Sequence, residues 1–229
     1  MCGRFTLRTP LTVLAKQFQF ELDFADSGPR YNIAPTQDVP AVRIADGKRE
    51  LAMLHWGLIP VWAKDKKIAF STINARGDTV ATKPAFRSAF KKRRCLVLAD
   101  GYYEWQRDGK TKLPWLYEVD GGKPFALAGL WEAWFGPGKS DGPPLESCSL
   151  ITTDANELAA KVHDRMPVIL DPIDYDAWLD PENDDTSELQ RLLEPYDPTH
   201  MTAKPASTFV NNARNQGPEC VGGTRVNDR

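Results

Sequence analysis

The feature that most constrains the fold of this sequence is a series of short apolar segments, each closed by a turn. They have the length and the alternating or continuous apolar character of strands rather than of helices. They lie at 39–44, 50–54, 95–106, 113–119, 125–134 and 148–153. Asp46-Gly47 is a hairpin signal between the first two, and Asp100-Gly101 divides the third into two strands. The sequence therefore predicts a protein in which short β-strands are numerous.

A smaller number of segments have helical spacing. Their ranges are 11–20, 84–94, 154–162, 174–179 and 186–193. The third prediction rests on Asp154 and Glu157, which have the spacing of a capping box. Between these elements, Cys95 and Cys148 lie in apolar stretches and are expected in the core, and Phe70 is expected to pack there too.

The length of the chain, 229 residues, is enough to bury about 70% of the unfolded surface in one domain. We expect that domain at 1–222, followed by a polar, disordered tail at 223–229. No apolar run approaches the ~18 residues of a membrane span, and no secretory signal precedes the first helix. The four cysteines are scattered without a CxxC pair, which argues against a zinc site and a disulfide framework. We expect a soluble, cytoplasmic monomer of bacterial origin without metal or cofactor.

The charge of the chain is unevenly distributed, although the net charge is only -2. Residues 60–115 hold 13 Lys and Arg against 5 Asp and Glu, a net of +8, whereas residues 171–197 hold 1 against 10, a net of -9. A local basic face can follow a phosphate backbone even on a mildly acidic protein. The simpler interpretation is that both regions are solvated surface.

The second residue of the chain, Cys2, is a candidate nucleophile towards aldehydes. Removal of Met1 would leave Cys2 with an amine and a thiol on adjacent carbons, a 1,2-aminothiol. An α-amino group has a pKa near ~7.8 against ~10.4 for lysine, so it is neutral far more often at pH 7. A neutral amine attacks an aldehyde to form an imine, and the neighbouring thiol can then close a five-membered thiazolidine. The alternative is that Cys2 is a small buried residue, as free cysteines usually are.

Other candidate residues lie in short motifs further along the chain. Asn74 and Arg76 stand on a turn, where an amide can fix a sugar and a guanidinium can bind a phosphate. Glu104, among aromatic residues on a strand, is either a proton-transfer group or a solvated edge residue. His163 ends the predicted third helix, where it complements the dipole or shuttles protons. Trp62, beside lysines, is a possible stacking platform for an unpaired base.

Seven motifs in one order connect these residues. They are MCGRF, YNIAPT, WGLIP, INARGDT, ADGYYEW, HDRMPVIL and VNNARNQGPEC. Together they resemble the SOS response-associated peptidase (SRAP) family of abasic-site processing proteins, from Cys2 to about Cys220. The resemblance implies a single compact α+β domain of bent, mostly antiparallel sheets with flanking helices and a groove for single-stranded DNA. Members lose Met1 and link Cys2 covalently to an abasic deoxyribose as a thiazolidine.

The resemblance also implies roles for individual residues. Cys2 would be the nucleophile, Asn74 would orient it, and Glu104 and His163 would transfer protons. Contacts to DNA are expected from Arg4, Arg76, Trp62, Asn32 and Lys67. The expected partners are single-stranded DNA with abasic sites and, in a DNA damage response, replication-fork proteins.

Two other function classes fit the same residues. A protease-like enzyme with an N-terminal nucleophile, as the family's name suggests, would need an oxyanion hole and a peptide groove. A non-covalent reader of single-stranded DNA would lose its ligand on denaturation and at high salt. The resemblance to the SRAP family itself also implies a capacity for self-processing peptidase and lyase activity.

Overall fold

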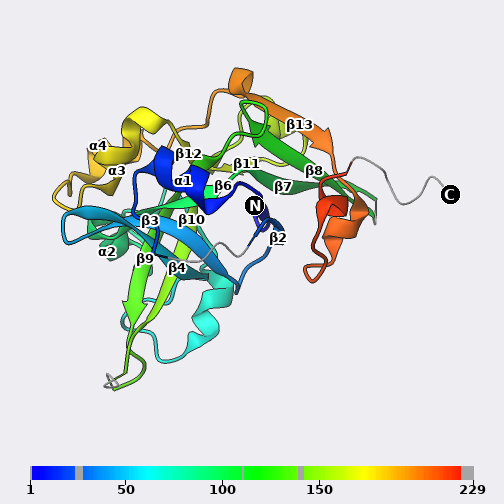
Figure 1. Cartoon of the computed structure of the whole chain (residues 1–229). Coiled ribbons are helices and arrows are strands. Elements are labelled where there is room, and N and C mark those ends of the chain that lie inside the picture. Colours follow the sequence, from blue (N-terminus) through cyan, green and yellow to red (C-terminus); the bar gives the residue numbers. More distant parts are fainter. Residues whose placement is uncertain (1, 24–27, 110, 139–141, 223–229) are drawn as a thin grey trace.

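The computed structural model of the chain describes residues 2–23, 28–109, 111–138 and 142–222. Two β-sheets form its centre, and short helices lie against them (Figure 1). The single compact α+β domain that the sequence motifs implied is confirmed. The tail at 223–229 lies outside the described residues. No helix in the described part of the chain is long and apolar enough to cross a membrane.

The first sheet has five strands in the order β13-β8-β7-β1-β2, and every neighbouring pair is antiparallel. Its strands are β1 (Phe5–Leu7), β2 (Arg30–Ile33), β7 (Gly101–Asp108), β8 (Thr111–Val119) and β13 (Met201–Pro205). The strand nearest the start of the chain, β1, therefore has a partner on both sides. This position fixes the backbone that follows Cys2.

The second sheet has eight strands in the order β11-β10-β4-β3-β6-β9-β12, with β5 beside β10. Because β10 also pairs with β9, the strands β10, β4, β3, β6 and β9 close into a ring. The pairs of β10 with β4 and β5 are parallel, and the other pairs are antiparallel. The strands are β3 (Asp38–Ala45), β4 (Lys48–Trp56), β5 (Asn74–Arg76), β6 (Arg94–Ala99), β9 (Phe125–Trp134), β10 (Leu145–Asp154), β11 (Arg165–Pro167) and β12 (Ile169–Leu170).

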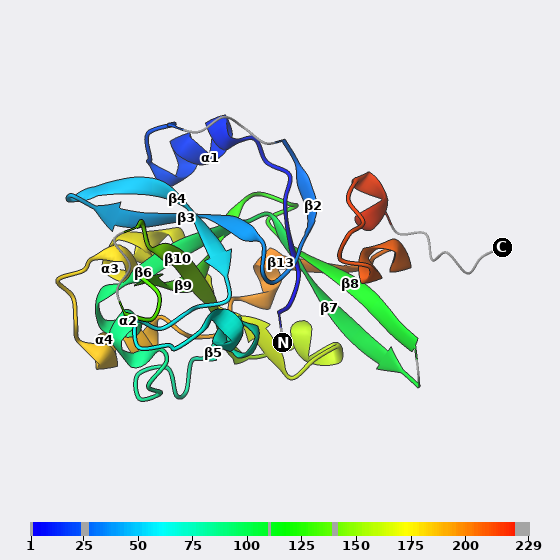
Figure 2. The same ribbon diagram turned by 90° about the horizontal axis from the view of Figure 1, so that it is seen from below.

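The helices are short. The α-helices are α1 (Leu11–Phe18), α2 (Arg87–Lys92), α3 (Tyr175–Leu179) and α4 (Thr186–Arg191). The 3-10 turns are η1 (Lys66–Ser71), η2 (Ala159–Lys161), η3 (Pro172–Asp174), η4 (Pro198–His200), η5 (Thr208–Asn211) and η6 (Pro218–Cys220). Helices α2, α3 and α4 lie on the side of the closed sheet opposite the β7–β8 hairpin (Figures 1 and 2). The acidic segment is thus separated from that hairpin.

Local sequence signals predicted several of these elements. The Asp46-Gly47 turn joins β3 and β4, and both residues adopt the positive φ angles, 48° and 75°, that such a hairpin turn needs. Cys95 and Cys148 are fully buried in the core, as expected. The two strands on either side of Asp100 are also present, but β6 and β7 belong to different sheets. Asp100 is therefore the crossing point between the sheets.

Two predictions are wrong. The helix at 154–162 does not form, because Asp154 is still in β10, where it pairs with Arg165 of β11. Asn156 accepts the backbone hydrogen bonds instead, from Leu158 and Ala159, and only the single turn η2 follows. Phe70 is not in the core: 71% of its surface is exposed, because η1 points it outwards.

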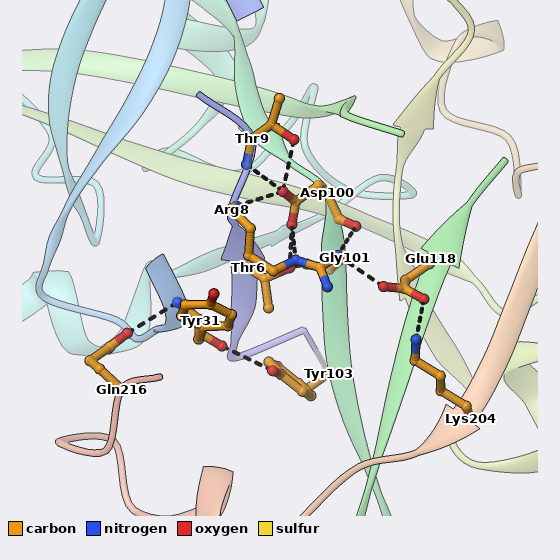
Figure 3. Close-up of polar contacts among 10 residues, drawn as sticks. All are labelled: Thr6, Arg8, Thr9, Tyr31, Asp100, Gly101, Tyr103, Glu118, Lys204 and Gln216. Carbon is orange, nitrogen blue, oxygen red and sulfur yellow. Dashed lines mark hydrogen bonds and ion pairs between the residues drawn. The ribbon is translucent and has the colours of Figure 1, made fainter. Parts of the chain in front are cut away.

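A polar network holds the first strand against the rest of its sheet (Figure 3). The buried carboxylate of Asp100 accepts hydrogen bonds from Thr6, Arg8 and Thr9. Arg8 also pairs with Glu118 at 2.9 Å, so the same cation joins Asp100, the residue before β7, to β8. These hydrogen bonds and ion pairs therefore fix the start of the chain to the neighbouring strands.

Candidate active site

Cys2 lies three residues before β1, in the segment that begins the chain between the closed sheet and the β7–β8 hairpin (Figure 2). The side chain of Asn74, the first residue of β5, donates a hydrogen bond from Nδ2 to the Cys2 carbonyl oxygen at 2.8 Å. Asn74 belongs to the closed sheet and β1 to the other, so this bond joins them at the predicted nucleophile. The proximity of Asn74 and Cys2, 72 positions apart, follows from the fold alone.

The thiol of Cys2 is buried. Its S–H group makes a long hydrogen bond, 3.9 Å, to the carbonyl oxygen of Arg4. Burial raises the pKa of the Cys2 thiol to about 12, and the negative charge of Glu104 adds to the effect. The thiol is therefore protonated at neutral pH, and an aldehyde would meet the amine before it meets a thiolate.

A pocket of about 490 Å³ opens beside this residue. Its walls come from the N-terminal segment, the β7–β8 hairpin, the turn after η2 and the turn η5. The lining residues are Gly3, Arg4, Glu104, Trp105, Arg107, Lys112, His163 and Asn211. A second depression shares three of these residues and extends to Lys161 and Asp164. The lining combines one carboxylate with several cationic groups, which suits an anionic ligand.

Glu104 and His163 both face this pocket from different elements. Glu104 is nearly buried on β7, on the face of the strand opposite to its neighbour Trp105. The ring Nδ1 of His163 accepts a hydrogen bond from the backbone N–H of Arg165 at 3.0 Å and lies 2.8 Å from a carboxylate oxygen of Asp164. In a neutral ring with its proton on Nε2, Nδ1 accepts the backbone hydrogen bond, whereas a doubly protonated ring would donate from Nδ1 to the Asp164 carboxylate instead.

Arg4 is held in the pocket wall by the end of the chain. Its guanidinium donates to Asn32 at 2.6 Å and to the Val210 carbonyl at 3.0 Å, and it lies 5.5 Å from the centre of the Trp105 ring. Asn32 also donates to the carbonyl oxygens of Asn212 and Asn215. Asn32 is fully buried, and its side chain is engaged by Arg4 and by the end of the chain. Its amide acts on the pocket through Arg4.

The remaining predicted DNA contacts lie outside the pocket lining. Arg76 is exposed on β5, where both carboxylate oxygens of Asp78 bind it, at 2.5 and 3.1 Å. Trp62 is 58% exposed and Lys67 is exposed, both on the segment that leads into η1 or forms it. Phe70, on the same turn, is a second exposed aromatic residue.

Sequence reasoning did not single out Arg107, Lys112 and Asn211, which complete the pocket lining. The first two flank the turn between β7 and β8 and contribute to the positive charge counted over 60–115. The excess of Lys and Arg in that range indicated a basic surface, but it could not predict which of these side chains line the pocket. In the part of the chain that the structure describes, no three His, Cys, Asp or Glu side chains gather as metal ligands.

Comparison with protein families identifies the kind of chain to which this geometry belongs. The family model described as "SOS response associated peptidase (SRAP)" matches residues 1–213. The chain belongs to the SRAP family. Among curated SRAP relatives, the abasic site processing protein YoqW of Bacillus subtilis is 43% identical over 224 residues, which is 96% of this chain and 99% of the relative.

Relatives of the SRAP family also occur in animals and among solved structures. The abasic site processing protein HMCES of Xenopus tropicalis is 35% identical, covering 84% of this chain and 65% of its own. A crystal structure of a protein from Bacteroides thetaiotaomicron superposes with a TM-score of 0.85 at 28% identity, covering 97% of this chain and all of the other, 100%. The SRAP fold of this chain therefore agrees with an experimental structure along almost its whole length.

Proposed function

We propose that this protein captures abasic sites in single-stranded DNA by forming a covalent thiazolidine between Cys2 and the ring-opened deoxyribose. The observation that carries the proposal is the bond from Asn74 to the Cys2 carbonyl beside a pocket lined by Glu104 and His163. These residues come from separate elements and converge on one end of the chain. The names of the curated relatives, abasic site processing proteins, favour the same substrate.

The first stage of the proposed reaction needs the Cys2 amine, which becomes available when Met1 is removed. The amine adds to the C1′ aldehyde, and loss of one water gives an imine. A closed sugar exposes little aldehyde, so a group that delivers and removes protons at the ring oxygen would quicken capture. Glu104 lines the pocket and would serve this exchange, and His163, which lines the pocket from another element, would be a second proton donor or acceptor.

The second stage closes the ring. The thiol sulfur of Cys2 adds to the imine carbon, its S–H bond breaks, and the nitrogen gains a proton. Since burial raises the pKa of the free thiol to about 12, this addition would follow the attack by the amine rather than precede it. The order of the two stages is thus a consequence of where the thiol lies.

The DNA strand itself would be held by the cations around the pocket. Arg4, Arg107 and Lys112 line it, and neutralised phosphates account for much of the affinity of proteins for nucleic acid. The exposed rings of Trp62 and Phe70 would offer faces for unpaired bases. Arg76 is engaged by Asp78 and would have to exchange that partner for a phosphate.

The test is a denaturing gel after incubation with an abasic single-stranded oligonucleotide. Wild-type protein is expected to give a slow-migrating adduct, Cys2→Ala none, and Glu104→Gln the same adduct more slowly. Cys95→Ala, which alters a thiol in the core of the closed sheet, is the matched control and keeps the reaction. An oligonucleotide with a tetrahydrofuran in place of the abasic sugar has no aldehyde and should bind without linking. An adduct of normal rate with Cys2→Ala would rule the mechanism out.

A further inference from the structure

Two stacked, buried tyrosines lie on the same two strands as the pocket residues of the β7–β8 hairpin. Tyr102 on β7 and Tyr117 on β8 are directly opposite in the register of the two strands. Their rings are stacked, with centres 4.8 Å apart and planes at 8° to each other. Each side chain is only 1% exposed, and neither lines the pocket. The pair is therefore fixed by packing on the inner side of the site.

The hydroxyl groups of both tyrosines are unusual for buried donors. Neither hydroxyl has a hydrogen-bond partner among the described residues. The neighbouring tyrosine shows the ordinary arrangement, since the Tyr103 hydroxyl donates to the carbonyl oxygen of Tyr31 at 2.9 Å (Figure 3). Buried hydroxyls are paired in the large majority of cases, so an unpaired one calls for an explanation.

The surroundings of the two hydroxyls supply that explanation. Glu104 is two residues beyond Tyr102, so both side chains leave the strand on one face. Cys2 packs in the same buried cluster as Tyr102 and Tyr117. Burial raises the pKa of both tyrosines, and the negative charge of Glu104 adds to the effect at each. Both hydroxyls thus keep their protons and remain donors near a carboxylate.

We propose that Tyr102, supported by Tyr117, is a positioning residue for the reaction at Cys2, and that its hydroxyl donates to the ionised carboxylate of Glu104 in the reacting state. The inference rests on the proposed function. In ring closure the S–H bond of Cys2 breaks, sulfur bonds to the imine carbon, the C=N electron pair moves to nitrogen, and Glu104 relays the proton to that nitrogen. A donor behind Glu104 keeps the carboxylate ionised and oriented for this transfer.

The pH dependence of the reaction would report this role. Among the described residues, the charged or titratable groups that line the pocket with Glu104 are Arg4, Arg107, Lys112 and His163, and Cys2 interacts electrostatically with both Glu104 and Tyr102. A hydrogen bond to a charged group changes the equilibrium constant for ionisation of that group by about a factor of ten or more. Without it, the protonated form of Glu104 is favoured, so the acid limb of the rate profile moves to higher pH. The rates of variant and wild type then converge on the alkaline side.

The experiment compares Tyr102→Phe and Tyr117→Phe with Tyr103→Phe, using the rate of adduct formation on abasic single-stranded DNA as a function of pH. Tyr102→Phe is expected to react about tenfold more slowly on the acid side, with a smaller effect for Tyr117→Phe. Binding of the tetrahydrofuran oligonucleotide should not change. Because the lost hydroxyl has no partner, the unfolding midpoint should stay the same or rise. Tyr103→Phe, which loses a bond to Tyr31, should lower the midpoint and leave the pH profile unchanged.

Two results would overturn the inference while leaving the proposed function intact. One is a Tyr102→Phe protein that reacts with the wild-type rate and profile. The other is a Tyr102→Phe protein that is slower by the same factor at every pH and less stable, as a packing defect would make it. If wild type itself forms no adduct, the proposed function fails and this inference fails with it.

Discussion

Replacement of Asp100 by Asn tests how firmly the segment that follows Cys2 is held. The carboxylate of Asp100 is 2% exposed and pairs with Arg8 at 3.0 Å. One of its oxygens accepts from the Thr6 hydroxyl and Arg8 Nε, and the other accepts from the backbone of Arg8 and from the backbone and hydroxyl of Thr9 (Figure 3). An asparagine can keep only one of these oxygens.

The structure sets the size of the expected loss. The amide nitrogen would take the position near Thr6, because the other position faces two backbone N–H groups. The Thr6 hydroxyl can rotate to accept, whereas the bond from Arg8 is lost together with its ion pair. A hydrogen bond to a charged group contributes ~1.5–3 kcal/mol, and Arg8 keeps Glu118, so we expect a loss of ~2–3 kcal/mol in the free energy of unfolding.

Thermal and urea unfolding measure this change. At ~2–4 °C per kcal/mol for a domain of this size, the midpoint should fall by ~4–12 °C. Asp120→Asn is the control, because it removes a carboxylate that is 42% exposed and paired with His200, and exposed pairs contribute ~1 kcal/mol or less. A midpoint for Asp100→Asn that equals that of Asp120→Asn would refute the view that this network anchors the first strand.

Two further predictions concern the thiol and the DNA surface. Because burial raises the pKa of Cys2 to about 12, the thiolate is scarce below that pH, and iodoacetamide should label Cys2 far more slowly in the folded than in the urea-unfolded protein at pH 8. Peptide mass mapping measures the labelling of Cys2, and equal labelling rates in the folded and unfolded protein would contradict this prediction. Trp62→Ala and Phe70→Ala should each weaken binding of single-stranded DNA by ~1–3 kcal/mol per stacked base, measured by fluorescence anisotropy. Ile173, 84% exposed in the acidic segment, is the control, and Ile173→Ala should leave the affinity unchanged. Identical affinities for all three variants would exclude base stacking on Trp62 and Phe70.

Elements with strong local signals could be predicted from the sequence. The α1 helix has apolar residues at helical spacing, which bury Leu14 and Phe18, and the hairpin at Asp46-Gly47 has the residues that its turn demands. The helix expected after Asp154 does not form, because Asp154 is the last residue of β10 and pairs there with β11. Short strands such as β5 and β12 exist only through their neighbours, so no pattern within them could have revealed them.

For the candidate site, the identity of the residues could be predicted from the sequence, but their arrangement could not. Cys2, Asn74, Glu104 and His163 could be chosen from their motifs, since each has a chemistry that its residue type suggests. Their convergence could not be predicted from spacing, because it depends on the junction of two sheets. The burial of Asn32 was likewise hidden, since its amide pairs with carbonyl groups about 180 positions away.

The most direct test of the account is the intact mass of the purified chain before and after incubation with an abasic oligonucleotide. We predict a starting mass lower than that of the printed sequence by one methionine residue. We also predict a product heavier by the oligonucleotide minus one water, the balance of thiazolidine formation. A chain that retains Met1 and yet gains the DNA, or one that has lost Met1 and gains nothing, would contradict the claim that Cys2 is the capturing group.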